Sequence, residues 1–228
     1  MTNRAWVDLE KEDFRGMLIN LVGYRFGPCP EEKLEDIRQD RAIYAARFIR
    51  MAGVRPGDVV LDLGSGCGFG TAAIAQHAGR VIACDISPAY LEFARSECAA
   101  LDNVQFHLIS RHDLSPVEDQ SVDTVISMAV FIHLNLYDIY LYFEEIRRVL
   151  KTGGKVLIDF ANMNRLFSRI PNRDQDRQFL AHAGFYRDNP GALAGLVQWN
   201  SARGIRGVAH ELGFRFVKRR GHKLLFRL

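Results

Sequence analysis

Short hydrophobic runs alternate with amphipathic stretches along most of this chain. The runs with the length of a buried strand are residues 59–63, 81–85, 104–109, 123–128 and 155–160. The stretches that predict helices are 30–52, 68–77, 87–100, 138–150 and 201–212. Residues 161–200 are predicted to be irregular, and two last strands are predicted at 214–218 and 224–228. Strands that alternate with helices predict an α/β fold, with a mostly parallel sheet covered on both faces.

The turn after the first strand is rich in glycine. The strand carries one acid, Asp62, and glycine then occupies every second position, at 64, 66, 68 and 70. A residue without a Cβ lets a ligand approach the main chain closely, and the helix that follows points its free N–H groups at the turn. Together these features predict a nucleotide cradle. The dinucleotide fingerprint with glycines at positions 1, 3 and 6 does not fit, because the sixth residue is Phe69 counted from Gly64 and Thr71 counted from Gly66.

The acid followed by alternate glycines resembles motif I of the class I S-adenosylmethionine-dependent methyltransferases, and three later landmarks resemble the same family. Asp85 ends the second strand, 21 positions after Gly64, residues 122–127 resemble the fourth strand, and residues 145–155 resemble a helix–turn–strand signature in which Thr152 replaces the usual proline. The resemblance covers roughly residues 40–160 and points to the type 11-like group that methylates small molecules. It implies a doubly wound, Rossmann-like sheet of seven strands that closes with an antiparallel hairpin. It also implies S-adenosylmethionine as cofactor and S-adenosylhomocysteine as product.

The resemblance also implies which residues bind the cofactor. Asp62 is expected to hold its methionine part, directly or through water, and Asp85 to accept hydrogen bonds from the ribose hydroxyls. The other expected contacts are the turn residues Gly64, Ser65, Gly66 and Gly68, the adenine neighbour Ile86, and the strand-end residues Ser127 and Met128. The alternatives are a turn-capping carboxylate at Asp62 and a core position for Ile86.

The adenine edge departs from the family pattern. The family often places an acid after the third strand, and here Arg111 occupies that position. His112 is therefore a candidate to contact the adenine ring, with an exposed loop position as its alternative. Asp113 is a candidate to replace the missing acid after a local shift of the chain.

His133 is the candidate general base. It follows the fourth strand, where the ligand crevice of an open α/β sheet lies, and a histidine titrates near neutral pH. The alternative is a structural role. Tyr24, Arg25 and Tyr44 are candidates to reach the cofactor carboxylate or the substrate, with helix packing and surface charge as alternatives.

Composition excludes several classes of protein. The chain has 228 residues, of which 48% are hydrophobic and 25% charged, and a net charge of +3, which is ordinary for a globular domain and too small to indicate a nucleic-acid partner. No signal peptide and no membrane span of about 18 residues is predicted, so we expect a cytoplasmic protein. The four cysteines lack metal-ligand spacing, so no metal is expected. The basic residues at 218–223 are interpreted as a solvated turn rather than a nucleic-acid patch.

We expect one methyltransferase domain over residues 1–228. Its parts are an N-terminal helical cap (1–52), a cofactor-binding core (53–160), a substrate lid (161–200) and a closing helix with a strand hairpin (201–228). The predicted function is methyl transfer to an oxygen, nitrogen or carbon atom of a small molecule, by in-line displacement. The alternatives are a cofactor-binding regulatory or partner protein without transfer activity, and an RNA or protein methyltransferase. The oligomeric state is left open.

Overall fold

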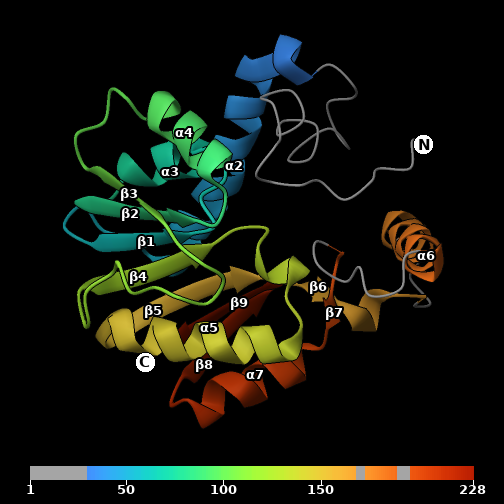
Figure 1. Ribbon diagram of the computed structural model, residues 1–228. Coiled ribbons are helices and arrows are strands. Elements are labelled where there is room, and N and C mark those ends of the chain that lie inside the picture. The colour runs from blue at the N-terminus through green and yellow to red at the C-terminus, as the bar shows by residue number, and fades with distance from the viewer. Residues whose placement is uncertain (1–29, 168–172, 189–195) are drawn as a thin grey trace.

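A seven-stranded sheet forms the centre of the protein in a computed structural model that describes residues 30–167, 173–188 and 196–228. The strand order is β3-β2-β1-β4-β5-β9-β8. The strands are β1 (Val59–Leu63), β2 (Arg80–Asp85), β3 (Val104–Leu108), β4 (Val122–Ser127), β5 (Leu150–Asp159), β8 (Arg215–Arg220) and β9 (Lys223–Arg227). The first five run parallel, and β9 lies antiparallel between β5 and β8. The predicted parallel sheet with a closing antiparallel hairpin is confirmed (Figure 1).

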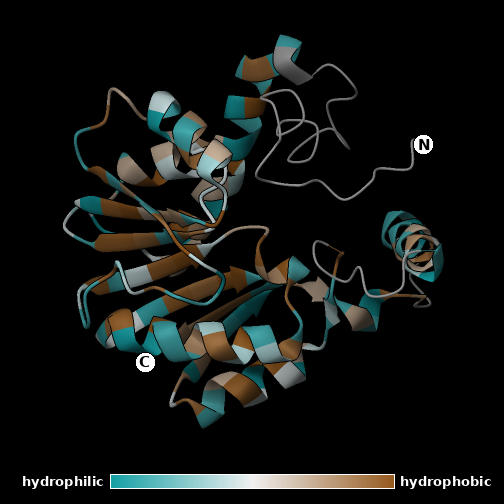
Figure 2. Ribbon diagram, viewed as in Figure 1, coloured by the Kyte–Doolittle hydropathy of each residue, from teal (hydrophilic) through white to brown (hydrophobic). Residues whose placement is uncertain are grey.

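Helices cover both faces of the sheet. One face carries α2 (Leu34–Ala52), which follows the short η1 (Pro30–Lys33), together with α3 (Phe69–Ala75) and α4 (Pro88–Glu97); the other carries α5 (Leu136–Val149) and α7 (Ala202–Glu211) (Figure 1). Hydrophobic residues follow the central strands, and polar residues mark the outward sides of the helices (Figure 2).

Aromatic rings fasten α5 to the sheet. The ring of Phe143 on α5 lies 5.1 Å from that of Phe214 and 5.4 Å from that of Phe226, each nearly at right angles. All three side chains are at most 2% exposed. Edge-to-face rings at this spacing are favourable beyond the area they bury, so this cluster fixes the closing hairpin against α5.

The strand β5 begins earlier than predicted. Its expected start was residue 155, but it begins at Leu150, which pairs with Val122, and the register then shifts before Thr124. Gly153 has a φ of +80° within this stretch. The Gly-Gly pair is therefore an irregularity inside a strand rather than the turn before it, because glycine accommodates the backbone conformation that a bulge needs.

The prediction that residues 161–200 are irregular is wrong for much of the segment. The structure has a second small sheet of β6 (Ala161–Asn162) and β7 (Trp199–Asn200), the short η3 (Met163–Arg165) and a helix of 16 residues, α6 (Arg173–Asp188). These elements lie beyond the carboxyl end of β5 (Figure 1). Half-buried Phe179, His182 and Phe185 recur every third residue along α6, but the polar residues between them mask this pattern in the sequence.

The predicted cap of α4 is confirmed. Ser87 accepts a hydrogen bond from the Tyr90 N–H at 3.3 Å, and Pro88 is the first helical residue. We expect Ser87→Ala to lower the free energy of unfolding by about 1 kcal/mol, because a helix N–H loses its acceptor. Urea unfolding of both proteins tests this, and an unchanged midpoint would show that the cap contributes nothing.

Candidate functional site

The candidate site lies at the carboxyl ends of β1, β2 and β4. The strand order reverses at β1, which pairs with β2 on one side and β4 on the other, and ligands of open α/β sheets bind at such a switch point. The N–H groups of Gly64 and Ser65 both donate to the Cys84 carbonyl, at 2.8 and 3.0 Å. These bonds fasten the glycine turn to the end of β2.

The three turn glycines meet different surroundings. Gly64, Gly66 and Gly68 all have positive φ, at +77°, +53° and +80°. A Cβ on Gly64 would lie 2.1 Å from a methyl of Val130, and one on Gly68 would lie 2.9 Å from the Ala94 backbone, whereas one on Gly66 would meet nothing within 4 Å. Packing inside the protein therefore requires the first and third glycines, and Gly66 alone of the three faces open space.

Asp62 lies behind this turn with one oxygen unpartnered. Its side chain is 1% exposed, and its Oδ2 accepts a hydrogen bond from Thr71 Oγ1 at 2.6 Å, while its Oδ1 has no partner among the described residues. Burial raises the pKa of Asp62 to about 7; the Thr71 hydroxyl lowers it in part and the charge of Asp85 raises it. Sequence reasoning missed Thr71, whose only signal is a hydroxyl in the first turn of an alanine-rich helix.

Asp85 is the second buried carboxylate of the site. It is 6% exposed, and it accepts the N–H groups of Gly66 at 2.7 Å and Ser87 at 2.9 Å. Burial raises the pKa of Asp85, although these N–H bonds lower it in part. Two buried carboxylates, each with a pKa raised by burial, are suited to a ligand with positive charge. The buried Ser65 hydroxyl, which also lacks a partner, adds a further polar group, so these residues fit a cationic nucleoside such as S-adenosylmethionine.

Two exposed apolar side chains flank Asp85. Ile86 is 49% exposed, as suits a neighbour of an adenine ring, and Leu108, which pairs with Asp85 across β2 and β3, is 53% exposed. Sequence reasoning named Ile86 and missed Leu108. Its signal was its place near the carboxyl end of the predicted third strand.

The residues at the expected adenine edge all have protein partners. Arg111 has a φ of +41°, and its carbonyl accepts the Tyr142 hydroxyl at 2.5 Å. His112 Nε2 lies 2.8 Å from Asp138 Oδ1, and its ring packs edge-on against Tyr142. Asp113 accepts the Ser115 N–H at 2.8 Å, which holds a local turn. Contacts from these residues to adenine stay a prediction.

The end of β4 is held by neighbouring strands. Ser127 is fully buried, and its hydroxyl donates to the Leu63 carbonyl at 2.8 Å, so that hydroxyl joins β4 to β1. Met128 packs on α3, where a Cβ on Gly70 would lie 2.5 Å from its methyl. The next residue, Ala129, has a φ of +61°, which L-residues adopt at a cost.

A carboxylate at the end of β5 holds Ala129 in its strained conformation. Asp159 is 2% exposed; its Oδ1 accepts the Ala129 N–H at 2.9 Å, and its Oδ2 accepts the Tyr44 hydroxyl at 2.5 Å. Of the predicted candidates on the N-terminal side, Tyr44 thus bonds to Asp159, whereas Tyr24 and Arg25 lie outside the described residues. Sequence reasoning missed Asp159, which is the last residue of β5 and follows the apolar run 156–158.

His133 lies at the carboxyl end of the sheet, in the short η2 (Phe131–His133) between β4 and α5. Its side chain is exposed and lies close to His182 on α6. Burial lowers the pKa of His182, and the charge of His133 lowers it further. The structure thus brings the candidate base next to α6, and its role in proton transfer stays a prediction.

Other site chemistries find no support in the described part of the chain. No group of three or more His, Cys, Asp or Glu side chains could hold a metal ion there. Cys67, Cys84 and Cys98 are buried and form no disulfide within the described residues, and burial raises the pKa of both Cys84 and Cys98 to about 12. None of the helices described is long and apolar enough to cross a bilayer.

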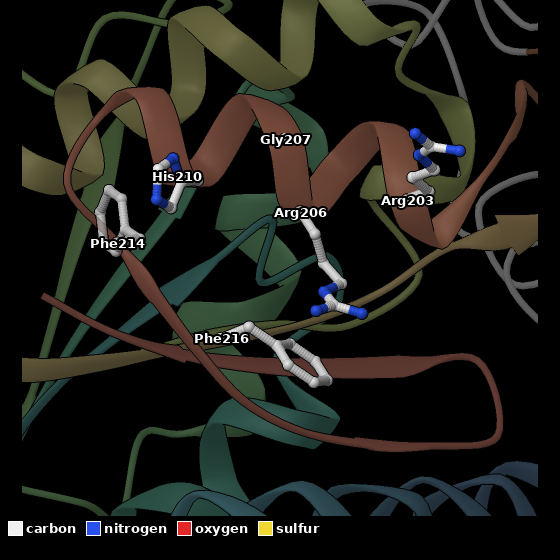
Figure 3. Close-up of a pocket in the computed structure, with 6 residues that line it drawn as sticks. All are labelled: Arg203, Arg206, Gly207, His210, Phe214 and Phe216. Carbon is white, nitrogen blue, oxygen red and sulfur yellow. The ribbon is translucent and has the colours of Figure 1, made fainter.

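A hollow of about 470 Å³ lies between α7 and β8, away from the strand ends of β1 and β4. Its lining residues are Arg203, Arg206, Gly207, His210, Phe214 and Phe216 (Figure 3). The Arg206 guanidinium lies over the Phe216 ring, 4.1 Å from its centroid. Because β8 is the edge strand farthest from β3, this hollow is separate from the site built on Asp62 and Asp85.

Comparison with known proteins finds similarity over the core of the chain. Residues 61–158 match the family described as a methyltransferase domain. A demethylmenaquinone methyltransferase of Tropheryma whipplei (strain Twist) is 35% identical over 117 residues, which are 51% of this chain and 47% of that protein. An arsenite methyltransferase of Halobacterium salinarum is 42% identical over 113 residues, 47% of this chain and 28% of that protein.

The chain thus spans less than half the length of either curated relative. Among solved structures, geranyl diphosphate methyltransferase in complex with SAM has a TM-score of 0.60 and 21% identity, covering 78% of this chain and 66% of that chain. At this identity the likeness establishes a common fold.

Proposed function

We propose, from the premise that this chain belongs to the class I S-adenosylmethionine-dependent methyltransferases, that it transfers a methyl group from S-adenosylmethionine to an oxygen, nitrogen or carbon atom of a small molecule. The observation that carries the proposal is the unpartnered Oδ1 of buried Asp62 beside a turn that is open at Gly66. When bound, the cofactor supplies a methyl group on a positively charged sulfur, which is an activated leaving group.

The chain's own residues bind and orient this cofactor. Asp62 would hold the ammonium group of the cofactor, directly or through one water, on the oxygen that has no partner among the described residues. Gly66 lets the cofactor lie against the main chain, and Asp85 accepts the ribose hydroxyls on lone pairs that its two N–H bonds leave free. Ile86 and Leu108, exposed beside Asp85, would supply apolar contacts to the adenine ring. An opposite charge beside Asp62 and Asp85 offsets the cost of their burial.

On the acceptor side, positioning and exclusion of water carry the reaction. We assign residues 161–200 to the substrate lid, because β6, η3, α6 and β7 lie beyond the carboxyl end of β5. His133 beside α6 is the proposed base for an acceptor that must lose a proton. Relatives named for demethylmenaquinone and arsenite support a small-molecule acceptor. A cytoplasmic location and the lack of a nucleic-acid partner remain predictions from the sequence.

Calorimetric titration with S-adenosylhomocysteine tests cofactor binding, with NADH as the comparison ligand. We expect binding of the first and none of the second. Transfer of a labelled methyl group from S-adenosylmethionine to a panel of small molecules, RNA and protein then tests the acceptor class. Binding without transfer to any acceptor would favour a partner or sensor role, and transfer to RNA or protein alone would favour a macromolecular substrate. No uptake of S-adenosylhomocysteine would overturn the whole proposal.

Asp85→Asn is expected to weaken the affinity for S-adenosylhomocysteine roughly 30-fold, because the ribose hydroxyls lose a charged acceptor. Calorimetry measures the dissociation constant. Asp102→Asn removes an exposed acid from the loop before β3 and serves as the matched control, with no expected change. Equal affinities for Asp85→Asn and the unsubstituted protein would contradict the ribose role.

A further inference from the structure

Four basic residues lie on segments that adjoin at the ends of β5 and β9: Arg47 on α2, Arg165 on η3, His222 just before β9, and Lys223 as its first residue. We call them the strand-end cation cluster. Lys223 Nζ lies 3.1 Å from His222 Nε2. Burial, together with the charges of Lys223, Arg165 and Arg47, lowers the pKa of His222 to about 4. Tyr44 and Phe48, which flank Arg47 on α2, lie beside the Lys223 ammonium, and the Phe160 N–H bond to the His222 carbonyl fixes the start of the segment that carries Arg165. The imidazole is therefore neutral at pH 7, and the positive charge of the cluster comes from the lysine and the two arginines.

Lys223 is the fixed, buried member of the cluster. It is 7% exposed, and its ammonium lies 5.2 Å from the ring centre of Tyr44 and 5.1 Å from that of Phe48. Burial lowers the pKa of Lys223, which the charge of Asp159 offsets in part. Asp159 is already engaged by the Tyr44 hydroxyl and the Ala129 N–H.

The two arginines are the exposed members, and they lack an offsetting carboxylate. Neither Arg47 nor Arg165 forms an ion pair with a described carboxylate, whereas the charge of Asp159 offsets that of Lys223 in part. The wider surroundings are also basic, because residues 199–228 contain eight Lys and Arg against one Glu, a net charge of +7, while the rest of the chain carries −4. Like charges held together in this way favour an anionic ligand.

The cluster lies on the acceptor side of the sheet edge. The Asp159–Ala129 bond joins it to the end of β4, where the candidate base follows in η2. The Phe160 N–H donates to the His222 carbonyl at 3.0 Å, which holds the tip of the β8–β9 hairpin against the end of β5. The cluster is therefore fixed by backbone bonds at the edge that carries Asp62 and Gly66, displaced from them toward β5 and β9.

We propose that the methyl acceptor carries an anionic group, a carboxylate or a phosphate. Arg47 and Arg165 bind this group, and the buried ammonium of Lys223 adds positive charge to the cluster. This inference rests on the proposed function. The arginines act in specificity and positioning, since an anion held at β5 and β9 leaves the rest of the acceptor free to extend toward β4. The positive end of the chain also steers an anionic acceptor toward this edge.

Calorimetric titration of two anions, inorganic pyrophosphate and benzoate, tests binding without any need for turnover. The protein is saturated with S-adenosylhomocysteine, and sodium chloride matches the ionic strength. We expect at least one anion to bind, and the tighter of the two identifies phosphate or carboxylate as the preferred group. Arg47→Gln and Arg165→Gln should each weaken binding roughly 10-fold through loss of a charge-assisted bond. Arg203→Gln, an exposed arginine of the α7 hollow (Figure 3), is the matched control and should change nothing.

Failure to bind either anion, or equal weakening by Arg203→Gln, would overturn the inference. Transfer assays with paired acceptors, each acid beside its neutral methyl ester, give a second readout. We expect transfer to acids only, with Arg47→Gln raising KM roughly 10-fold at an unchanged kcat. Equal transfer to acids and esters would leave the proposed function standing and reject the anionic acceptor. Should S-adenosylhomocysteine itself not bind, the proposed function falls, and the anion titration is run on the ligand-free protein.

Discussion

Asp62→Asn is expected to weaken the affinity for S-adenosylhomocysteine roughly 100-fold while it makes the ligand-free protein more stable by roughly 1–2 kcal/mol at pH 8. The two effects have one cause. The buried carboxylate has an oxygen without a partner, which costs free energy until a cation arrives. An amide keeps the bond with Thr71 and avoids burying a charge, although its own unpartnered NH₂ group retains part of the cost.

The pH dependence follows from the pKa of Asp62, which is about 7 in the folded protein and 3.8 ordinarily. Between these values the folded state holds more protons at this group than the unfolded state does. The contribution of Asp62 to stability therefore falls as pH rises from about 4 to 7, and then levels off. The advantage of Asp62→Asn should be larger at pH 8 than at pH 5. Affinity of the unsubstituted protein for S-adenosylhomocysteine should rise over the same range, because an ammonium prefers the ionised carboxylate.

Urea unfolding at pH 5 and pH 8, together with calorimetry, measures both effects. Asp123→Asn is the matched control, an aspartate on β4 bonded to Lys151 Nζ at 2.8 Å and to the Val59 N–H at 2.8 Å. Burial tends to raise the pKa of Asp123, but these bonds and the charges of Lys151 and Lys155 lower it overall. The same substitution should therefore destabilise the protein at this position and leave binding intact. A destabilised Asp62→Asn protein with full affinity would reject the assigned role.

The sequence predicts the sheet well because its strands are short apolar runs, which the local sequence alone is enough to identify. The first strand, Val59–Leu63, lies where the pattern placed it. The helix α6 was missed because its apolar residues pack on a few local rings, such as Phe167 and Trp199 around Phe179, and polar residues separate them. A helix that contributes little to the main core leaves a weak hydrophobic period.

The residues of the candidate site likewise differ in whether the sequence predicts them. The acids Asp62 and Asp85 lie near the carboxyl ends of predicted strands, so their position in the chain is enough to identify them as candidate site residues. Contacts between distant segments are not visible in this way: Tyr44 and Asp159 lie 115 residues apart, yet they share a hydrogen bond. The sequence also shows that the turn contains several glycines without showing which of them faces a ligand, since that depends on packing against Val130 and Ala94.

Gly66→Ala and Gly68→Ala should separate binding from folding within this one turn. A Cβ on Gly68 would meet the Cα and Cβ of Ala94 at 2.9 Å with φ at +80°. Because a helix backbone cannot yield as a side chain does, we expect a loss of about 3 kcal/mol in the free energy of unfolding. A Cβ on Gly66 meets nothing within 4 Å. That variant should lose only about 1 kcal/mol, from its φ, but should bind S-adenosylhomocysteine roughly 50-fold more weakly because the methyl group occupies ligand space.

Gly213→Ala provides the control that isolates backbone strain from ligand contact. Gly213 has a φ of +85°, a Cβ there meets nothing within 4 Å, and it follows α7, away from the turn. Its variant should match Gly66→Ala in stability and the unsubstituted protein in affinity, as measured by urea unfolding and calorimetry. If Gly68→Ala does not fold, the comparison of Gly66→Ala with Gly213→Ala still shows whether the cofactor lies against the turn at Gly66. Equal affinities for those two variants would mean that the open face of the turn is not where the cofactor lies, because strain is the only change they have in common.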